Sequence, residues 1–409
     1  METYVALCGV GVERVTANEL RKLGLSVEDT GFGRVRFRAD TRGCYRALMG
    51  LRTADRVLWE AARFPAADFD ALFEGIRAAP WEGFIPRTMG LRVVKVRSNR
   101  SRLRGVTSIQ GVAHKAAAER LCGKYRVSRL DERGAMADLR VYLEKDVAQV
   151  LLDLSGEPLF KRGYRAEGGI APLRETTAAS LLFLSNWRRK FPFCDPLCGS
   201  GTIAIEAALY AWDAAPGTGR DFAFAGMLCA DGQTEREVRE DFLSRTDFTR
   251  TIRIFGSDAD PRAVEGARSN LLRAYRLACG ERLRPGPAGS VGLAGSVGPA
   301  GPEFSGAGGK PALPVFETAG MGDLKAPFDG PGFIITNPPY GVRLGDPGEA
   351  EAVYRGMGVL CRIFPGWKLA CISDHAGFES FFGRKADSCR EMTNGAIRSY
   401  FYQYEALRG

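Results

Sequence analysis

The chain has 409 residues, of which 45% are hydrophobic and 26% charged, so we expect more than one folding unit and exclude a chain that is disordered throughout. The formal net charge is +9; no apolar run approaches the roughly 18 residues of a membrane span, and no secretion signal opens the sequence. Ten scattered cysteines and two histidines predict neither a disulfide framework nor a zinc site, so we expect a soluble protein of the reducing cytoplasm.

The first predicted elements form a small α+β unit. Residues 4–9 and 33–39 have the composition of strands, and an amphipathic helix over about 11–23 lies between them. A second unit begins near residue 60. It contains a predicted strand (91–98), a helix (109–123) and two strands (138–145 and 147–155) joined by a tight turn.

The positive charge is concentrated in these two units. Residues 1–165 hold 30 Lys and Arg against 20 Asp and Glu, whereas residues 166–409 hold 27 against 28. Within the second unit, Arg92 to Arg129 contains eleven basic residues and one acid, Glu119. Such a cluster predicts a surface that binds phosphate groups, and a solvated face without a partner is the alternative.

After a Gly- and Arg-rich connector, strands alternate with helices from residue 172 onward. This alternation predicts a doubly wound parallel sheet, and Asn394-Gly395 predicts a hairpin turn between the two last strands. The predicted strands of this half cover 191–196, 252–258, 332–337, 367–373, 388–393 and 396–404. Between Pro285 and Pro314, 15 of 30 residues are Gly or Pro, so we expect 281–316 to be a disordered insertion.

A glycine-rich turn follows the strand that ends near residue 196. Gly199 and Gly201 let the backbone approach a ligand, and the following helix start offers unpaired N–H groups. The spacing matches neither the dinucleotide motif nor the P-loop. Asp195 would repel a pyrophosphate, but it suits a ligand with an ammonium group. A tight turn without a ligand is the alternative.

Two further acids follow later strands. Asp258 ends the predicted strand 252–258, where its carboxylate can accept both hydroxyl groups of a ribose. Asp258 and Asp260 could equally cap the next helix. Asp323 follows an apolar segment and could contact an adenine amino group.

The most specific motif is Asn337-Pro338-Pro339-Tyr340, at the end of an apolar strand. Two prolines cannot continue a strand, so the carbonyl groups of Asn337 and Pro338 stay free at the carboxyl edge of the sheet. The Asn337 side-chain oxygen and a neighbouring carbonyl can accept both hydrogens of an exocyclic NH₂ group, and Tyr340 offers a stacking face for a flat base. Such acceptors orient the nitrogen lone pair toward an activated methyl group. A plain turn at the strand end is the alternative.

Taken in order, these motifs resemble those of the THUMP-domain guanine-N2 RNA methyltransferases, which are class I S-adenosylmethionine-dependent enzymes. The runs APLRETTAASLLFLSNW, FCDPLCGSGTIAIEAAL, GSDADPRAV and TNPPYGVRLG are similar to the catalytic domain of that family. YVALCGVGVERVTANELRKLG resembles its N-terminal ferredoxin-like domain, and SRLRGVTSIQGVAHKAAAERL resembles its THUMP module. The resemblance covers nearly the whole chain except 281–316.

The resemblance implies an α/β fold with a Rossmann-like methyltransferase sheet and an antiparallel C-terminal hairpin, preceded by α+β domains. It implies four segments: a ferredoxin-like domain (1–59), a THUMP RNA-binding domain (60–156), a linker (157–171) and a methyltransferase domain (172–409). The implied activity is methylation of guanine N2 in RNA, foremost in large-subunit ribosomal RNA. Transfer RNA guanine, adenine N6 and a non-catalytic RNA-binding assembly factor remain alternatives.

The resemblance also implies roles for individual residues. Asp195, Gly199 and Gly201 would hold the methionine end of S-adenosylmethionine, Asp258 its ribose and Asp323 its adenine. Asn337, Pro338, Pro339 and Tyr340 would position the target amine, and no metal is implied. The basic residues that we expect to bind RNA are Arg97, Arg100, Arg102, Arg104 and Lys115.

Overall fold

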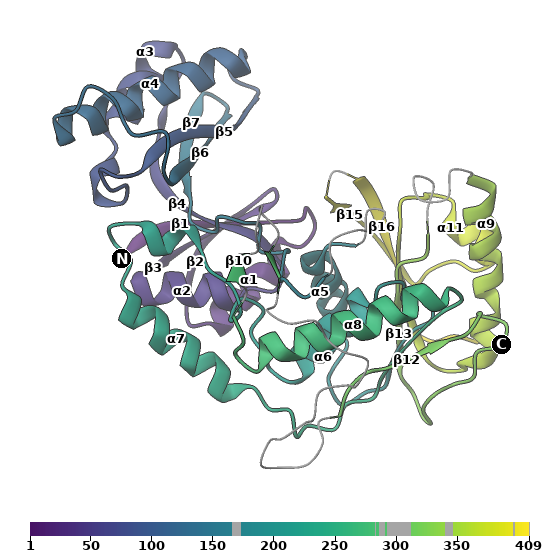
Figure 1. Ribbon diagram of the computed structural model, residues 1–409. Helices are drawn as coiled ribbons and strands as arrows, with labels where there is room; N and C mark the ends of the chain where they lie inside the picture. Colours follow the sequence, from purple (N-terminus) through teal and green to yellow (C-terminus); the bar gives the residue numbers. More distant parts are fainter. Residues whose placement is uncertain are drawn as a thin grey trace.

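The computed structural model describes residues 1–165, 173–282, 284–285, 291–292, 312–339, 347–395 and 397–408. Over this part of the chain, two seven-stranded sheets form, one before residue 154 and one after residue 192. Figure 1 shows helices packed on both sheets and a lobe with α3 and α4 that stands away from the second sheet.

The first sheet has the strand order β2-β3-β1-β4-β7-β6-β5, and only β5 and β6 run parallel. β3 shows the alternation that specifies such a sheet: Val35 and Phe37 are fully buried, whereas the alternating Arg34, Arg36 and Arg38 point to the other face. The elements are β1 (Glu2–Cys8), α1 (Glu13–Lys22), β2 (Ser26–Gly31), β3 (Arg34–Ala39), α2 (Thr41–Gly50), β4 (Ala54–Pro65), α3 (Phe69–Ala78), η1 (Trp81–Gly83), β5 (Gly90–Asn99), α4 (Val106–Tyr125), β6 (Met136–Glu144) and β7 (Val147–Asp153).

The 12-residue strand β4 belongs to both predicted N-terminal units. Its first half pairs with β1, with Trp59 opposite Tyr4, and its second half pairs with β7, with Pro65 opposite Val147. The boundary that we predicted between residues 59 and 60 therefore falls inside one continuous strand. Sequence reasoning missed β4 because its alternation is interrupted by a bulge between Glu60 and Ala62.

The second sheet has the order β12-β9-β8-β13-β14-β16-β15, with parallel pairing from β12 to β14 and antiparallel pairing at β16. Successive strands are added on one side of β8 and then, from β13, on the other, so the sheet has a switch point between β8 and β13. The elements are α5 (Glu175–Leu184), β8 (Phe193–Asp195), α6 (Thr202–Ala211), η2 (Ala223–Gly226), α7 (Gly232–Arg245), β9 (Ile254–Asp258), α8 (Pro261–Ala278), β12 (Val315–Thr318), β13 (Phe333–Thr336), α9 (Pro347–Gly356), η4 (Met357–Val359), α10 (Leu360–Ile363), β14 (Lys368–Ser373), α11 (Phe378–Phe382), β15 (Ser388–Asn394) and β16 (Ile397–Tyr404).

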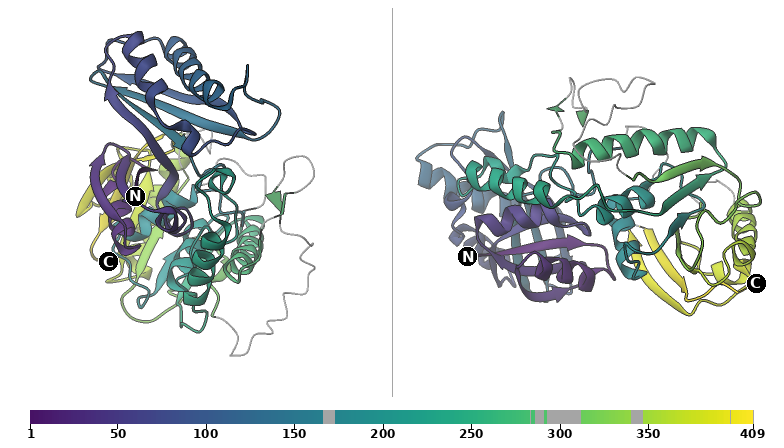
Figure 2. Two further views of the ribbon diagram at one scale, coloured as in Figure 1. Left: turned by 90° about the vertical axis from the view of Figure 1, so that its left-hand side faces the viewer. Right: turned by 90° about the horizontal axis from the view of Figure 1, so that it is seen from below.

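Helices cover the two faces of this sheet, as Figure 2 shows. The side chains of β13 alternate between two apolar clusters: Ile335 packs with α5, α6 and α8, and Ile334 packs with α9, α10 and α11. The predicted fold class, a mainly parallel α/β sheet with an antiparallel hairpin after an α+β N-terminal part, is confirmed. None of the helices in the described ranges has the length and hydropathy needed to cross a bilayer.

The C-terminal hairpin forms with a turn one residue later than predicted. Asn394 is the last residue of β15 and pairs with Ile397, so Asn394 belongs to the ladder, and the turn begins at Gly395, which has a φ of 65°. The asparagine keeps extended geometry because its backbone completes the ladder of β15 and β16. The other predicted tight turn is confirmed, with positive φ at both Lys145 and Asp146.

Most of the predicted insertion 281–316 lies outside the described residues. The described part includes β10 (Arg284–Pro285) and β11 (Val291–Gly292), which pair with each other. At its C-terminal end β12 begins with Val315, which pairs with Phe255 of β9. The insertion therefore ends before residue 315, because the following residues are needed as a strand of the sheet.

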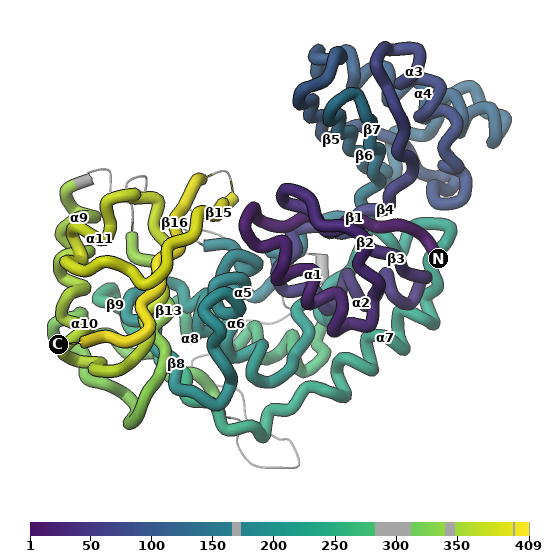
Figure 3. The backbone as a smooth tube through the Cα atoms, turned by 180° about the vertical axis from the view of Figure 1, so that it is seen from behind, coloured from purple at the N-terminus to yellow at the C-terminus, as the bar shows by residue number. Residues whose placement is uncertain are grey.

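The hairpin end also meets the first sheet. Val10 donates a backbone hydrogen bond of 3.0 Å to Thr393 Oγ1, and Thr393 N–H donates one of 3.4 Å to Val10 O. Figure 3 shows the β15–β16 hairpin beside the purple N-terminal segment near α1. A polar cavity of about 60 Å³ lies at this contact, with Asp55 and Thr176 in its lining. These contacts fix the first domain against the carboxyl edge of the second sheet.

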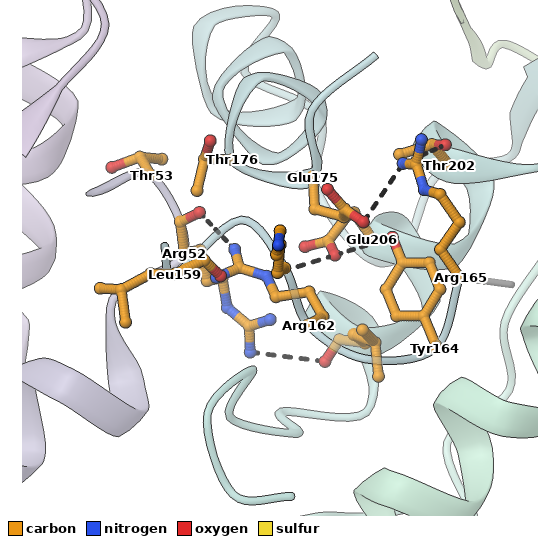
Figure 4. Close-up of polar contacts among 12 residues, drawn as sticks. Arg52, Thr53, Leu159, Arg162, Tyr164, Arg165, Glu175, Thr176, Thr202 and Glu206 are labelled. Carbon is orange, nitrogen blue, oxygen red and sulfur yellow. Dashed lines mark hydrogen bonds and ion pairs between the residues drawn. The ribbon is translucent and has the colours of Figure 1, made fainter. Parts of the chain in front are cut away.

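The described part of the predicted linker packs into the core of this interface (Figure 4). Arg162 is 3% exposed and donates hydrogen bonds to the carbonyl oxygens of Leu159, at 2.7 Å, and Arg52, at 2.5 Å. Its Nε atom lies 3.6 Å from Glu206 Oε1, which also accepts a 3.1 Å hydrogen bond from the Tyr164 hydroxyl. Arg52 and Glu206 are remote from this segment in sequence, so its composition alone predicted only a Gly- and Arg-rich connector.

Replacing Arg162 with methionine should lower the free energy of unfolding by about 3 kcal/mol, because the buried Glu206 carboxylate loses its cationic partner. Denaturant titration measures the change, and the exposed Arg236→Met variant is the control, with an expected loss below about 0.5 kcal/mol. Adding Glu206→Gln to Arg162→Met should restore part of the stability, since no unpaired charge remains. Equal stability of Arg162→Met and the control would contradict this account.

Candidate active site at the carboxyl edge of the second sheet

Asp195 ends β8 and is only 1% exposed. Its Oδ1 atom accepts a 2.6 Å hydrogen bond from the Thr336 hydroxyl, at the end of β13, and a 3.3 Å bond from Leu197 N–H. Burial raises the pKa of Asp195 to about 7, although both hydrogen bonds lower it, and the nearby Asp258 raises it further. A cationic group placed beside this carboxylate would therefore stabilise its ionised form.

The glycine-rich turn after β8 is tied to the end of β9. Gly199 N–H donates to Asp258 Oδ2 at 2.9 Å, and Cys198 N–H donates to Ser257 O at 2.9 Å. Gly199 and Gly201 have φ values of 52° and 79°, in the region that favours glycine. The turn thus brings Asp195, both glycines and Asp258 to one place, as predicted.

The two glycines have different surroundings. A Cβ atom on Gly201 would lie 2.9 Å from Ala267 Cβ and 2.9 Å from Phe316 Cζ, whereas one on Gly199 would have no described heavy atom within 4 Å. Gly201 is therefore required by the packing of α6 against α8 and β12. Gly199 leaves open space beside the turn, where a ligand can approach the backbone.

Asp258 and Asp260 have separate roles. Asp260 caps α8, since its side chain accepts the Arg262 N–H at 2.9 Å. Asp258 does not cap the helix, and its Oδ1 atom accepts Asp260 N–H at 3.0 Å. The partly exposed Asp258 carboxylate keeps lone pairs for ligand hydroxyl groups.

Asn337 directly follows β13, at the switch point of the sheet. Its side-chain Oδ1 atom is buried and has no hydrogen-bond partner among the residues that the structure describes. A buried acceptor without a partner is costly, so this atom is a candidate acceptor for a hydrogen bond from a ligand. Pro338 is buried and Pro339 half-buried beside it, and Tyr340 lies outside the described residues.

Asp323 is less closely tied to the site. The segment that leads to it begins beside Asp258, because Ala319 N–H donates to Asp258 O at 3.0 Å. Asp323 itself is exposed in a turn closed by its N–H bond to Gly320 O, at 3.0 Å. Its contact with an adenine remains a prediction.

The structure adds residues that sequence reasoning missed. Thr336 joins Asp195 to the Asn337 motif, and the signal for it was a hydroxyl directly before Asn-Pro-Pro. Glu175, at the start of α5, is 4% exposed, and burial raises its pKa to about 7. Arg165 lies 3.2 Å from Glu175 Oε1 and donates to Thr202 Oγ1 at 3.1 Å, at the start of α6 (Figure 4).

The predicted RNA-binding residues lie in the lobe that Figure 1 shows apart from the second sheet. Arg97 is on β5, Lys115 is on α4, and Arg100, Arg102 and Arg104 lie in the loop between them. All five side chains belong to exposed residues.

The cluster is less positive than its sequence suggests. Arg92 pairs with Asp138, and Arg120 pairs with Glu82 at 2.6 Å. Both acidic partners lie outside the segment from Arg92 to Arg129, Asp138 on the neighbouring strand β6 and Glu82 in η1. In the exposed loop, Arg102 also pairs with Asp146 at 3.4 Å. Among the described residues of β5 and this loop, the unpaired charge is therefore that of Lys95 and Arg97 on β5 and of Arg100 and Arg104 in the loop.

Comparison with known families decides the class of the site. A family model described as "RMKL-like, methyltransferase domain" matches residues 162–278 and 309–402, which is more than half of the chain. The chain belongs to the RMKL-like methyltransferase family. A second model, described as "RlmL ferredoxin-like domain", matches residues 3–58 of this RMKL-like methyltransferase. The family predicted from the sequence is confirmed, and the THUMP module remains a prediction.

Individual relatives agree with this assignment. The chain is 35% identical over 405 residues to the "Putative RNA methyltransferase YpsC" of Bacillus subtilis, covering 98% of this chain and 95% of that protein. It is 32% identical over 424 residues to the "Ribosomal RNA large subunit methyltransferase K/L" of Syntrophotalea carbinolica, covering 98% of this chain and 53% of that protein. The RMKL-like chain thus spans about half the length of its K/L relatives.

A solved structure has the same fold over its whole length. SMU.472, described as "a putative methyltransferase complexed with SAH", is 33% identical with a TM-score of 0.82, and the match covers 100% of this chain and 99% of that one. The described residues of the RMKL-like chain contain no group of three or more His, Cys, Asp or Glu side chains that could hold a metal ion.

Proposed function

We propose that this protein transfers a methyl group from S-adenosylmethionine to the exocyclic N2 atom of a guanine in RNA, within large-subunit ribosomal RNA. The observation that carries the proposal is the buried, unpartnered Oδ1 atom of Asn337 beside the Asp195–Thr336 hydrogen bond. An acceptor there suits an amine donor, and family membership supplies the reaction class. The names of the YpsC and K/L relatives support RNA as the substrate.

The residues at the strand ends fit S-adenosylmethionine. The ammonium group of its methionine end suits the buried Asp195 carboxylate, and the open space at Gly199 leaves room for a ligand. Its ribose suits Asp258, whose carboxylate already accepts a hydrogen bond from Gly199 N–H in the turn after β8. The SAH complex of SMU.472 supports the same choice, since SAH is the demethylated form of this cofactor.

The chain's own residues act by positioning. Bound S-adenosylmethionine would supply an electrophilic methyl group on a sulfonium sulfur. Asn337 Oδ1 and the adjacent carbonyl would accept the hydrogens of the guanine amine and aim its lone pair at that methyl group. As the nitrogen–carbon bond forms, the sulfur–carbon bond breaks, and the amine gives up one proton to water.

Cofactor affinity should depend on the ionisation of Asp195. Because the pKa of this carboxyl is raised to about 7, lowering the pH from 7.5 to about 5.5 protonates it and should weaken S-adenosylmethionine binding by roughly tenfold. Calorimetry across this range measures the effect. Asp195→Asn should bind weakly with little pH dependence.

Glu175→Gln is the matched control for this titration. Burial also raises the pKa of Glu175 to about 7, but Arg165 pairs with its carboxylate at the start of α6. The variant should therefore keep the pH dependence of the native protein. If Asp195→Asn also keeps it, the assignment to Asp195 is wrong.

RNA binding is assigned to the exposed basic loop and strand of the N-terminal lobe. Arg100→Glu together with Arg102→Glu should weaken binding of ribosomal RNA and reduce the slope of log affinity against log salt by roughly 1–2, because phosphate contacts release counterions. S-adenosylmethionine affinity should be unchanged. Filter binding at several salt concentrations measures the slope.

A control separates local contacts from net charge. Arg236→Glu with Lys385→Glu makes the same change in charge at exposed positions of the second half. This control should keep the salt slope. An unchanged slope in the Arg100 and Arg102 variant would remove the lobe from the account of RNA binding.

The domain division follows the same proposal. Residues 1–59 would be the ferredoxin-like domain, 60–156 a THUMP domain, and 172–409 the methyltransferase domain. The lobe of α3, α4 and β5–β7 supports a separate RNA-binding unit, since it is joined to the rest through β4 and β7. From the proposed reaction on ribosomal RNA we infer a cytoplasmic location.

The deciding experiment compares modified nucleosides of RNA from cells with and without the gene by mass spectrometry. Loss of N2-methylguanosine from large-subunit ribosomal RNA is the expected result. Loss of N2-methylguanosine from transfer RNA would show that transfer RNA is the substrate. Loss of N6-methyladenosine would show that adenine is the target base. No loss together with no S-adenosylmethionine binding would favour an RNA-binding assembly factor.

A further inference from the structure

A second group of polar side chains lies beyond the carboxyl end of β14. β13 and β14 pair in parallel, with Thr336 opposite Cys371, so Asn337 and His375 leave neighbouring strands at the same edge of the sheet. Glu351, on α9, lies beside His375, with 3.9 Å between its Oε1 atom and the histidine Nε2 atom. The proposed methyl transfer assigns no role to this pair.

The His375 ring is held in one orientation and one tautomer. Gly377 N–H donates to Nδ1 at 3.0 Å, so Nδ1 carries no proton and the neutral ring carries its proton on Nε2. The ring packs edge-on against Tyr354 and Phe381, with centroids 5.9 and 5.3 Å away. The Nε2–H group is therefore a preorganised donor.

Both facing atoms of the pair are available to a ligand. The separation of 3.9 Å is too long for a hydrogen bond, and Nε2 has no hydrogen-bond partner within the described ranges. Arg355 donates to Glu351 Oε2 at 3.3 Å, which leaves Oε1 facing the ring. The side chains of His375 and Glu351 are 31% and 27% exposed, so both can be reached from solvent.

We propose that His375 and Glu351 read the Watson–Crick edge of the target guanine. His375 Nε2–H donates to O6, Glu351 Oε1 accepts N1–H, and Asn337 accepts the neighbouring amino group. O6 and N1 are adjacent on guanine, so their partners must lie side by side, as these two atoms do. The inference rests on the proposed function and names the residues that select the base.

Adenine presents the opposite pattern to this pair. Its C6 amine is a donor and its N1 an acceptor. The His375 donor would therefore face a second donor, and the Glu351 acceptor would face a second acceptor. Unpaired polar groups cost far more than a lost contact once a bound base covers them from water, and sites built this way discriminate strongly between analogues. The pair thus gives a physical reason for guanine over adenine.

The test uses 2,6-diaminopurine, which keeps the C2 amine but has the adenine pattern at C6 and N1. Synthetic RNAs carry either guanine or this analogue at the guanine mapped by the nucleoside comparison. The native protein should prefer guanine in kcat/KM by roughly a hundredfold or more. His375→Phe keeps an aromatic ring and should lower kcat/KM on guanine by roughly tenfold or more, without lowering kcat/KM on the analogue.

Two further variants complete the design. Glu351→Ala should reduce the preference for guanine in the same way, and it keeps the proposal testable if His375→Phe does not fold. Glu349→Ala removes an exposed carboxylate from the same helix and should keep the full preference. S-adenosylmethionine affinity should stay within a few-fold in all three variants.

The outcomes separate this inference from the proposed function. Equal native rates on guanine and 2,6-diaminopurine would overturn the inference while leaving guanine methylation intact. A preference that survives in His375→Phe and Glu351→Ala would do the same. If the native protein methylates no guanine N2, the proposed function fails and this inference fails with it.

Discussion

Asn337→Ala should lower the methylation rate by roughly a hundredfold or more and leave S-adenosylmethionine affinity within a few-fold. The expected size is that of losing a positioned polar partner of the reacting group. The Oδ1 atom is buried without a partner among the described residues, so its removal costs the fold little. The measurement is kcat at saturating RNA and cofactor, with cofactor affinity from calorimetry.

Asp258→Ala is the converse variant. Its carboxylate accepts a hydrogen bond from Gly199 N–H in the glycine-rich turn. This substitution should therefore weaken S-adenosylmethionine binding first, and turnover should fall because less of the protein carries the cofactor. Raising the cofactor concentration should then restore much of the rate. Near-native turnover by Asn337→Ala under saturating conditions would show that the amine-positioning role is wrong.

Gly199→Ala and Gly201→Ala should separate cofactor binding from folding. An alanine at Gly201 meets Ala267 and Phe316 at 2.9 Å and must also adopt a φ of 79°, so we expect a loss of about 2–4 kcal/mol in the free energy of unfolding. An alanine at Gly199 pays only for its positive φ, about 1 kcal/mol. Its methyl group projects into the open space where the cofactor would lie.

For Gly199→Ala we therefore expect cofactor affinity to fall by roughly tenfold or more while most of the stability is kept. Denaturant titration and calorimetry on both variants test the contrast. Gly266→Ala is the control, since a Cβ atom on this glycine would also have no described heavy atom within 4 Å, yet the residue belongs to helix α8 and not to the glycine-rich turn. Undiminished affinity of Gly199→Ala would place the cofactor elsewhere.

Local patterns in the sequence predicted the strand ends that build the candidate site. Asp195, Asp258 and Asn337 each follow a short apolar run, and the carboxyl ends of parallel strands meet at one edge. The confirmed turn at Lys145 and Asp146 is also local, because a two-residue hairpin loop requires positive φ. These features depend on neighbours within a few residues.

Sequence reasoning was weaker where pairing crosses long distances. β4 was missed because a bulge breaks its alternation, and the hairpin turn was placed one residue early because Asn394 is held by its partner Ile397. The basic segment seemed nearly free of acids because its partners, such as Asp138 and Glu82, lie on other elements. In each case the deciding contact is absent from the local pattern.

The sequence by itself determined the α/β class, the order of the motifs and the residue types at the strand ends, since these follow from short-range periodicity and turn chemistry. Only the tertiary structure decided the state of those residues. Thr336, 141 residues from Asp195, donates to its buried carboxylate, and α9 places Glu351 beside His375, which follows β14. Burial and hydrogen bonding between distant residues set ionisation and orientation, and no local pattern encodes them.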